Sequence, residues 1–276
     1  MSYATAQKLR RIAAGVLMWI IALIVIIPLC IIIFGSLKSA PEAARFNAVP
    51  PLEWHFENYI YVIQNGGIIT AAKNSILITV TSIVVIIIVS VMSSFIIARR
   101  SGKYSSAAYN IFLMGMIAPL QLITTFGLLK VLHLMGTYTG VILIFSATQI
   151  PWAVFMLTSF VKTIPREIDE AAFMDGCGAV RMIFVIIIPL LKPVIATITV
   201  VLSMSVWNDL LIPLFFLNSS KKWTMSLTVY NFFGQYFSNW NYVFADMVLT
   251  AAPVVALYLF FQKYVVAGMT SGAVKG

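Results

Sequence analysis

Long uncharged stretches of apolar residues alternate along the chain with shorter polar segments. The first stretch, residues 13–34, contains 22 residues and no charged side chain. As a helix it would be about 33 Å long, enough to cross a hydrocarbon core of about 30 Å. It exceeds the apolar part of a cleaved signal peptide, so we expect an uncleaved first span. The same pattern predicts further spans at about residues 75–98, 106–129, 139–161, 193–217 and 246–266, with the third span broken by Pro119.

Composition supports a membrane protein over a soluble one. Of the 276 residues, 61% are hydrophobic and only 10% are charged, an apolar share that a soluble domain does not reach. The net charge of +9 would indicate nucleic acid in a soluble chain, but here the basic residues lie in short segments beside the spans, so no nucleic acid is expected. His55 and His133 are too few and too scattered for a metal site.

The distribution of lysine and arginine predicts the topology. With the N-terminus inside, 12 of the 18 basic residues fall in inner segments and six in outer segments. This bias predicts cytoplasmic segments at residues 1–12 and 267–276, on either side of a single six-span domain at residues 13–266. Two longer connections, 35–74 and the aromatic-rich 218–245, then lie outside, where we expect them to contact an external protein.

A cytoplasmic loop at residues 162–192 holds four of the nine acidic residues: Glu167, Asp169, Glu170 and Asp175. Pro165 and the acids after it are typical of a helix start, and glycine at 176 and 178 is typical of a helix stop. Helical spacing places four residues on one small, nearly flat face that suits docking to a partner: Ile168, Ala171, Ala172 and Asp175.

This loop resembles the EAA loop of ABC importer permeases. The resemblance rests on Glu170-Ala171-Ala172, then Gly176 after three residues, and Ile188-Pro189-Leu190 after an apolar stretch. Asp175-Gly176, Leu191-Lys192-Pro193, Trp207-Asn208-Asp209 before Pro213, and the final Gly-Ala-Val-Lys-Gly are similar to the carbohydrate-uptake branch, of the maltose/oligosaccharide type. The likeness covers most of the chain and is densest from Pro119 onward.

The resemblance implies an all-α integral membrane protein with six transmembrane helices and the type I ABC importer permease fold. In that family the loop forms a cytoplasmic coupling helix, seated in a cleft of an ATPase subunit. Carried over to this chain, the coupling residues are Ile168, Glu170, Ala171, Ala172, Asp175, Gly176 and Pro189. The implied partners are a second homologous permease subunit, two ATPase subunits and an extracytoplasmic sugar-binding protein.

No nucleotide or cofactor site is expected in the chain itself. It contains no G-x-x-x-x-G-K sequence, so ATP and Mg²⁺ would be bound by the ATPase partner. The expected role is that of a permease without enzymatic activity, which couples closure of the ATPases to alternating access for a sugar. Its location would be the cell membrane, with both termini cytoplasmic and lipid around the spans.

Candidate substrate-pathway residues come from polar groups inside the spans. Asp209 lies deep in the fifth predicted span, where a charge costs about 2.5–3.5 kcal/mol, so it is expected to face a polar cavity, a partner or the bundle interior. Trp207 and Asn208 adjoin it and offer the ring and amide that hold sugars, although packing between helices explains Asn208 and Asp209 equally well. Gln121 and Gln149 lie near prolines, and satisfying backbone groups there is favoured over contacting substrate.

Two alternatives remain at this point. A polyol or glycerol-phosphate substrate is compatible with the same permease fold, although the spans lack the basic residues that a phosphate favours. A secondary transporter driven by an ion gradient would explain Asp209, but not the cluster of acids in one cytoplasmic helix, and it predicts matched repeats that the chain lacks. A membrane-embedded enzyme would need more polar residues at one depth.

Overall fold

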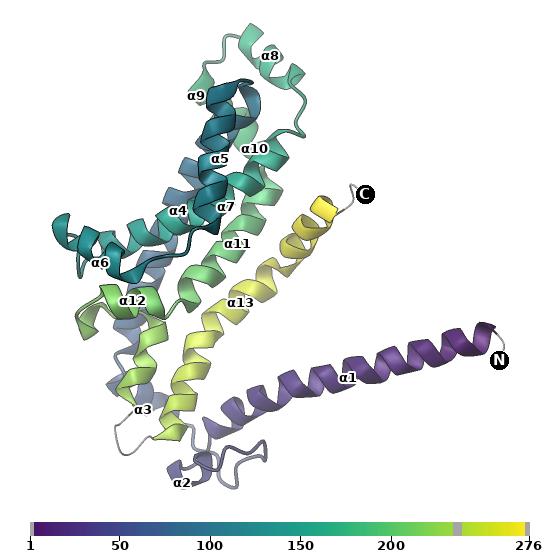
Figure 1. The fold of residues 1–276 in the computed structure, drawn as a ribbon. Helices are drawn as coiled ribbons and strands as arrows, with labels where there is room; N and C mark the ends of the chain where they lie inside the picture. Colours follow the sequence, from purple (N-terminus) through teal and green to yellow (C-terminus); the bar gives the residue numbers. More distant parts are fainter. Residues whose placement is uncertain (1–2, 234–238, 274–276) are drawn as a thin grey trace. The chain divides into compact units, whose positions relative to one another are not determined.

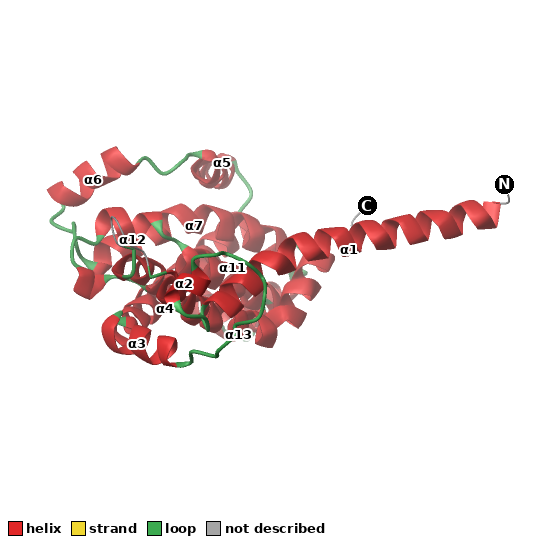
Figure 2. Cartoon of the chain, turned by 90° about the horizontal axis from the view of Figure 1, so that it is seen from below, coloured by secondary structure: helices red, strands yellow, loops and turns green. Residues whose placement is uncertain are grey.

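The computed structural model describes the backbone of residues 3–233 and 239–273, and every regular element in these ranges is a helix (Figure 2). The chain forms two compact units, each described by itself. Unit 1 comprises Met1–Ile69 and Thr228–Ala252, and unit 2 comprises Thr70–Leu227 and Pro253–Gly276. Tyr236 and Phe237 of the aromatic-rich connection lie outside the described residues.

Unit 1 contains three helices and the start of a fourth: α1 (Tyr3–Gly35), α2 (Ala40–Ala43), α3 (Glu57–Asn65) and α13 (Trp240–Ala273). Helix α1 ends at Gly35, whose backbone lies directly against the ring of Phe244. A Cβ atom at this position would collide with that ring, so the close approach requires glycine. The Oγ atom of Ser36 lies 2.7 Å from the hydroxyl oxygen of Tyr59 on α3. The connection after α1 is therefore held against α3 and α13.

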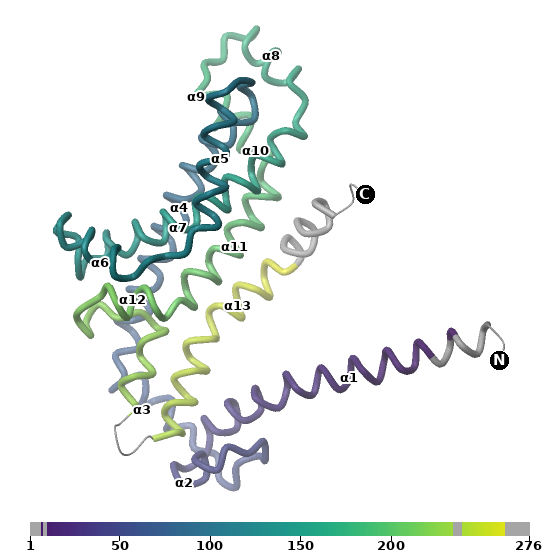
Figure 3. Tube along the Cα trace, viewed as in Figure 1, coloured from purple at the N-terminus to yellow at the C-terminus, as the bar shows by residue number. Residues whose placement is uncertain are grey.

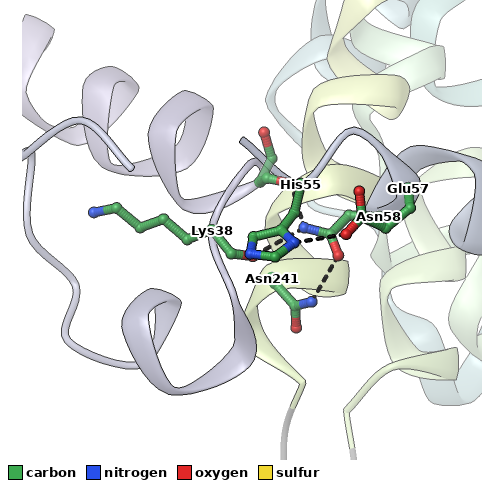
Figure 4. A network of polar contacts seen from close by, with 6 residues as sticks. Lys38, His55, Glu57, Asn58 and Asn241 are labelled. Atoms are coloured by element: carbon green, nitrogen blue, oxygen red, sulfur yellow. Dashed lines mark hydrogen bonds and ion pairs between the residues drawn. The ribbon is translucent and has the colours of Figure 1, made fainter. Parts of the chain in front are cut away.

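A buried amide joins three segments of unit 1 (Figure 4). Nδ2 of Asn58 donates to the carbonyl oxygens of Ser36 and Lys38, at 2.9 and 3.0 Å. Its Oδ1 atom accepts from Nδ2 of Asn241 at 2.9 Å. Asn58 and Asn241 are 4% and 5% exposed, so water does not compete for these groups. One side chain thereby ties the exit of α1 to the first turns of α3 and α13.

Two further polar contacts organise the same connection. The Lys38 side chain is buried, and its Nζ donates to Oδ1 and to the carbonyl oxygen of Asn47, at 2.6 and 3.2 Å. The Nδ1 atom of His55 lies 2.6 Å from Oε1 of Glu57, and this hydrogen bond lowers the pKa of the Glu57 carboxyl below its usual value (Figure 4). The loop is closed by its own side chains.

Replacing Asn58 by alanine should destabilise unit 1. The change leaves two carbonyls and an amide without partners, and each buried unpaired group costs about 1–3 kcal/mol. Asn65→Ala is the matched control, because among the described residues the side chain of this exposed asparagine on the same helix bonds only to the carbonyl of Tyr61. Thermal unfolding in detergent should show a clearly lower midpoint for Asn58→Ala alone. Equal midpoints for the two variants would contradict the role of the amide.

Unit 2 is a helical bundle built around α7. Outside the loop at 162–192, its helices include α4 (Ile68–Arg99), α5 (Lys103–Ile117), α6 (Leu122–Val131), α7 (Tyr138–Val161), α11 (Lys192–Asn208) and α12 (Leu211–Phe216). Helix α7 packs against α5, α11 and α12. Helix α4 turns a face of small hydroxyl residues inward: Ser75, Thr79, Ser82, Ser90 and Ser94 are all buried. Small residues at this spacing allow close approach of neighbouring helices.

The third predicted span is two helices. Helices α5 and α6 are bent by 115° relative to one another, and the connection between them contains Pro119 (Figure 2). Ala118, the residue before this proline, has extended backbone at φ −68°, ψ 121°, as the ring of a following proline favours. The break expected at Pro119 within the span 106–129 is therefore present, as two helices on either side of it.

Three other boundaries differ from those predicted. Helix α4 begins at Ile68 rather than 75, and in this added part Nδ2 of Asn74 donates to the carbonyls of Lys221 and Trp223. Helix α11 ends at Asn208 rather than 217, since Asp209 has extended backbone. Helix α13 begins at Trp240 rather than 246.

Four helices in the described part of the chain are long and apolar enough to cross a membrane: Arg10–Gly35, Ile68–Arg99, Tyr138–Val161 and Trp240–Gln262. Two bent pairs pass the same test together: Lys103–Ile117 with Leu122–Val131, and Ala179–Leu190 with Lys192–Asn208. If each pair is one span, the total is six. The all-α, multi-span class predicted from the hydrophobic pattern is confirmed.

Candidate functional site

Helix α8 (Glu167–Met174) stands at the end of unit 2 opposite α12 (Figure 1). Its first turn carries acids, which complement the positive end of the helix dipole. It ends in a Schellman motif: the N–H of Gly176 donates to the carbonyl of Phe173 and that of Cys177 to Ala172, at 3.0 and 2.9 Å. Gly176 has φ +75°, the left-handed conformation that glycine adopts without strain. The C-terminus of α8 is therefore defined by a specific hydrogen-bonded turn.

The structure divides the predicted coupling residues between two faces of α8. Ala172 is 5% exposed and belongs to the core of unit 2, and Ile168 is half-buried, so neither forms an open docking surface. Glu170, Ala171, Asp175 and Gly176 are exposed, as is Pro189 farther along the chain. The face expected to be flat and available is therefore partly the one that attaches α8 to its own unit.

The exposed side of α8 carries two large apolar residues that the sequence reasoning missed. Phe173 is 74% exposed and Met174 is 84% exposed. Their signal was present, since two large apolar side chains lie in the last turn of an otherwise acidic eight-residue helix. Large exposed apolar groups on a helix at the end of a bundle are typical of a docking surface.

The chain returns from α8 to the bundle through a continuous but irregular helix (Figure 3). It passes through α9 (Ala179–Met182), the π-helical turn η1 (Ile183–Ile187) and α10 (Ile188–Leu190), then bends by 80° into α11. Pro193 lacks an N–H and cannot bond to the carbonyl of Pro189, which interrupts the helical ladder at the bend. Pro189 of the predicted motif thus lies beside the hinge between the loop and the membrane helix.

Asp209 serves as a helix cap in the structure. Its Oδ1 atom accepts a hydrogen bond from the N–H of Ile212 at 2.8 Å, which satisfies a free donor at the start of α12. Its backbone carbonyl accepts from Oγ of Ser226, also at 2.8 Å. The packing explanation of this acid is thus supported by a specific bond, while its role in transport stays a prediction.

The other pathway candidates are dispersed. Trp207 is buried and lines an apolar cavity of about 380 Å³ in unit 2, between α4, α11 and the part of α13 from Pro253 to Leu257. Asn208 is exposed and does not line this cavity. Nε2 of Gln149 donates to Oγ of Ser205 on α11 at 3.2 Å, and Gln121 is exposed at the start of α6. The cavity wall is too apolar to be a complete sugar site by itself.

Two substitutions at Asp209 distinguish a role in helix capping from a need for its negative charge in transport. Asparagine caps helices as well as aspartate does, so Asp209→Asn should keep both assembly and transport. Asp209→Ala loses the cap and should destabilise the protein by about 0.5–2 kcal/mol, visible as a lower unfolding midpoint. Loss of transport by fully assembled Asp209→Asn would show instead that the charge acts in the pathway.

Comparison with known proteins identifies a family for this architecture. Residues 90–271 match the family described as "Binding-protein-dependent transport system inner membrane component". The melibiose/raffinose/stachyose import permease protein MelC of Bacillus subtilis is 31% identical over 253 residues, covering 91% of each chain. The multiple sugar-binding transport system permease protein MsmG of Streptococcus mutans is 31% identical, covering 98% of this chain and 99% of the relative.

A solved structure shows the same fold. A chain from a bacterial ABC transporter that imports the acidic polysaccharide alginate superposes with a TM-score of 0.84 at 23% identity, covering 96% of this chain and 99% of the other. The type I ABC importer permease fold expected from the EAA loop is thus confirmed, and the gradient-driven alternative is not favoured. The chain is a multi-pass membrane protein that belongs to the family of binding-protein-dependent transport system inner membrane components.

Proposed function

We propose that this protein is the permease subunit of an ATP-driven importer for an oligosaccharide or a monosaccharide. The relatives named for melibiose, raffinose and stachyose, and for multiple sugars, support the substrate class. The near absence of basic residues from the predicted spans favours a neutral sugar over a glycerol phosphate. The permease itself carries out no bond chemistry.

The proposed complex contains this chain, a second homologous permease, two ATPase subunits and an external sugar-binding protein. Both termini and α8 lie in the cytoplasm in the proposed topology, as the two-to-one bias of basic residues favours. ATP and Mg²⁺ are bound by the ATPase subunits. ATP-driven closure of these subunits moves α8, and the movement opens the translocation pathway to the loaded binding protein.

The observation that carries this proposal is the form of α8. It is a short helix with an ordered stop, attached to the bundle through Ala172 and presenting Phe173 and Met174 outward. In unit 1, the connection after α1, which the basic-residue bias predicts to lie outside the cell, exposes Leu52, Trp54 and Phe56, and the ring centroids of Trp54 and Phe56 are 6.3 Å apart in a stacked arrangement. We assign this second surface to the sugar-binding protein.

Partner identification tests the proposal directly. The tagged chain is purified from its native membrane in mild detergent, and its companions are identified by mass spectrometry. Recovery of an ATPase and a second multi-pass permease is expected, and reconstituted vesicles should take up sugar only with ATP inside. Recovery of the chain alone, in a detergent that preserves a known ABC complex, would overturn the proposal, as would uptake driven by a proton gradient with no ATP.

A further inference from the structure

Arg99, the last residue of α4, binds the segment that leads into α8. Its Nη1 atom donates to the carbonyl of Ile164 at 2.9 Å, and its Nη2 atom donates to Oδ1 of Asp169 at 3.3 Å. Its Nε atom forms an ion pair with Oδ2 of Asp169 at 2.6 Å. The guanidinium therefore holds the α7–α8 connection and the first turn of α8 at once.

The surroundings make this contact more than a surface ion pair. The side chains of Arg99 and Asp169 are only 12% and 17% exposed, so their attraction is screened less than that of open pairs. The Nη2 atom donates to one carboxylate oxygen of Asp169, while the Nε atom, which makes no hydrogen bond among the described residues, lies 2.6 Å from the other oxygen as an ion pair. The guanidinium thus contacts the Asp169 carboxylate and the Ile164 carbonyl through separate nitrogens, a set of contacts that lysine does not provide. An ion pair between solvent-exposed side chains has neither this burial nor these several contacts, and it contributes little to stability.

Asp169 is the only acid of α8 with an ion pair in the described part of the chain. Glu167 and Glu170 on the same helix are exposed. A hollow of about 600 Å³ lies beside the α7–α8 connection, lined by Ala98, Arg99 and residues 162–167. The connection is thus not packed on all sides. Helix α8 is attached to the bundle by Ala172 and, three residues earlier on the same helix face, by Asp169 through Arg99.

The sequence alone provided no reason to pair Arg99 with Asp169, because each residue already had a local explanation. The acids at the start of α8 complement the helix dipole, and the arginines at the end of a span follow the charge bias of inner loops. The structure joins one residue of each set across 70 positions. Because the pair joins α8 to the last residue of α4, a displacement of α8 that keeps the pair intact also displaces the end of α4. Helix α4 also lines the cavity beside Trp207.

We propose that Arg99 is a positioning residue that transmits the movement of α8 to α4 through Asp169 and the Ile164 carbonyl. This inference rests on the proposed function, in which α8 is moved by an ATPase. The pair acts as the polar link between the docking helix and a membrane helix, while the exposed side of α8 provides attachment to the partner.

The test uses the complete reconstituted complex and measures sugar molecules imported per ATP hydrolysed. The variants are Arg99→Gln, Asp169→Asn, Arg99→Lys and the exchange Arg99→Asp with Asp169→Arg. Arg100→Gln is the matched control, since Arg100 is the next residue, is exposed, and has no ion pair in the described residues. ATPase association is measured separately by co-purification.

Arg99→Gln and Asp169→Asn should keep the ATPase bound and active but lower the import per ATP by about tenfold, the usual scale for loss of a charged hydrogen bond. Arg99→Lys should be intermediate, the exchange should regain part of the loss, and Arg100→Gln should match the unsubstituted protein. An unchanged ratio in assembled Arg99→Gln would overturn the inference. So would failure of every variant, the exchange included, to assemble, which would make the pair a structural staple only.

The two proposals fail in different ways. If the unsubstituted chain binds no ATPase, the proposed function is wrong and the ratio has no meaning. If the unsubstituted complex imports sugar with ATP and the Arg99 variants do so with equal efficiency, only the role of this pair is wrong.

Discussion

Replacing Gly176 by valine should abolish import while the helical bundle stays folded. Gly176 has φ +75°, where a β-branched residue is strained by about 1–3 kcal/mol, so the chain would escape by rebuilding the turn after α8. The Schellman bonds to Phe173 and Ala172 would be lost and α8 would end differently. We expect an assembled complex that hydrolyses ATP but imports at least about tenfold less sugar per ATP.

The chain provides a matched control two residues away. A Cβ added at either Gly176 or Gly178 would meet nothing within 4 Å, so crowding is equal at the two sites. Gly178 has φ −69°, ψ 155°, an extended conformation that valine adopts readily. Gly178→Val should therefore import normally, and Gly176→Asn should be milder than valine because asparagine tolerates the left-handed region. Equal loss at both positions would show that backbone conformation is not the cause.

Replacing Phe173 and Met174 together by serine should weaken binding of the ATPase. Full burial of a phenylalanine or methionine side chain contributes about 1.5–3 kcal/mol, so losing both from an interface corresponds to about a hundredfold or more in affinity. Both side chains already face water in the isolated chain, so the fold should be unaffected. Co-purification of the ATPase at increasing wash volume, with the unfolding midpoint of the permease alone, separates the two effects.

Leu52→Ser controls for the general loss of an exposed apolar side chain. Leu52 is 88% exposed and lies in the connection that we assign to the other side of the membrane. This variant should retain the ATPase fully. Retention of the ATPase by the Phe173 and Met174 double variant would mean that another surface forms the attachment, and α8 would lose its assigned role.

Features set by local chemistry were predictable from the sequence. The acids before Glu170 and the glycine at 176 place a short helix and its stop, because dipole complementation and the left-handed turn act over a few residues. The same reasoning found Pro119 as a break but not the 115° bend, because a proline interrupts a helix without fixing the direction of the chain after it, and α5 but not α6 packs extensively against α7.

Features that depend on distant partners were not predictable in the same way. Asp209 in a long apolar stretch suggested a pathway role and a packing role equally. The structure ends α11 just before it and bonds its carboxylate to the N–H of Ile212 at the start of α12, a break in the helix that the apolar pattern did not indicate. Helical spacing could not show which side of α8 faces its own bundle. Both Ala172 and Phe173 are apolar, and only the tertiary packing buries the first and leaves the second exposed. The Arg99–Asp169 pair joins residues whose individual roles already had sufficient local explanations.

The π-helical turn η1 has a consequence for chain length between the docking loop and the membrane. A π turn holds one more residue than an α turn over the same rise, so Ile183–Ile187 contains a surplus residue. Removing one residue there converts the wide turn to an ordinary one and leaves the facing of α11 unchanged. Removing one residue within α11 instead rotates everything beyond it by about 100°. Deletion of one residue is therefore expected to be tolerated at η1 and to disrupt the bundle when made a few residues later, within α11.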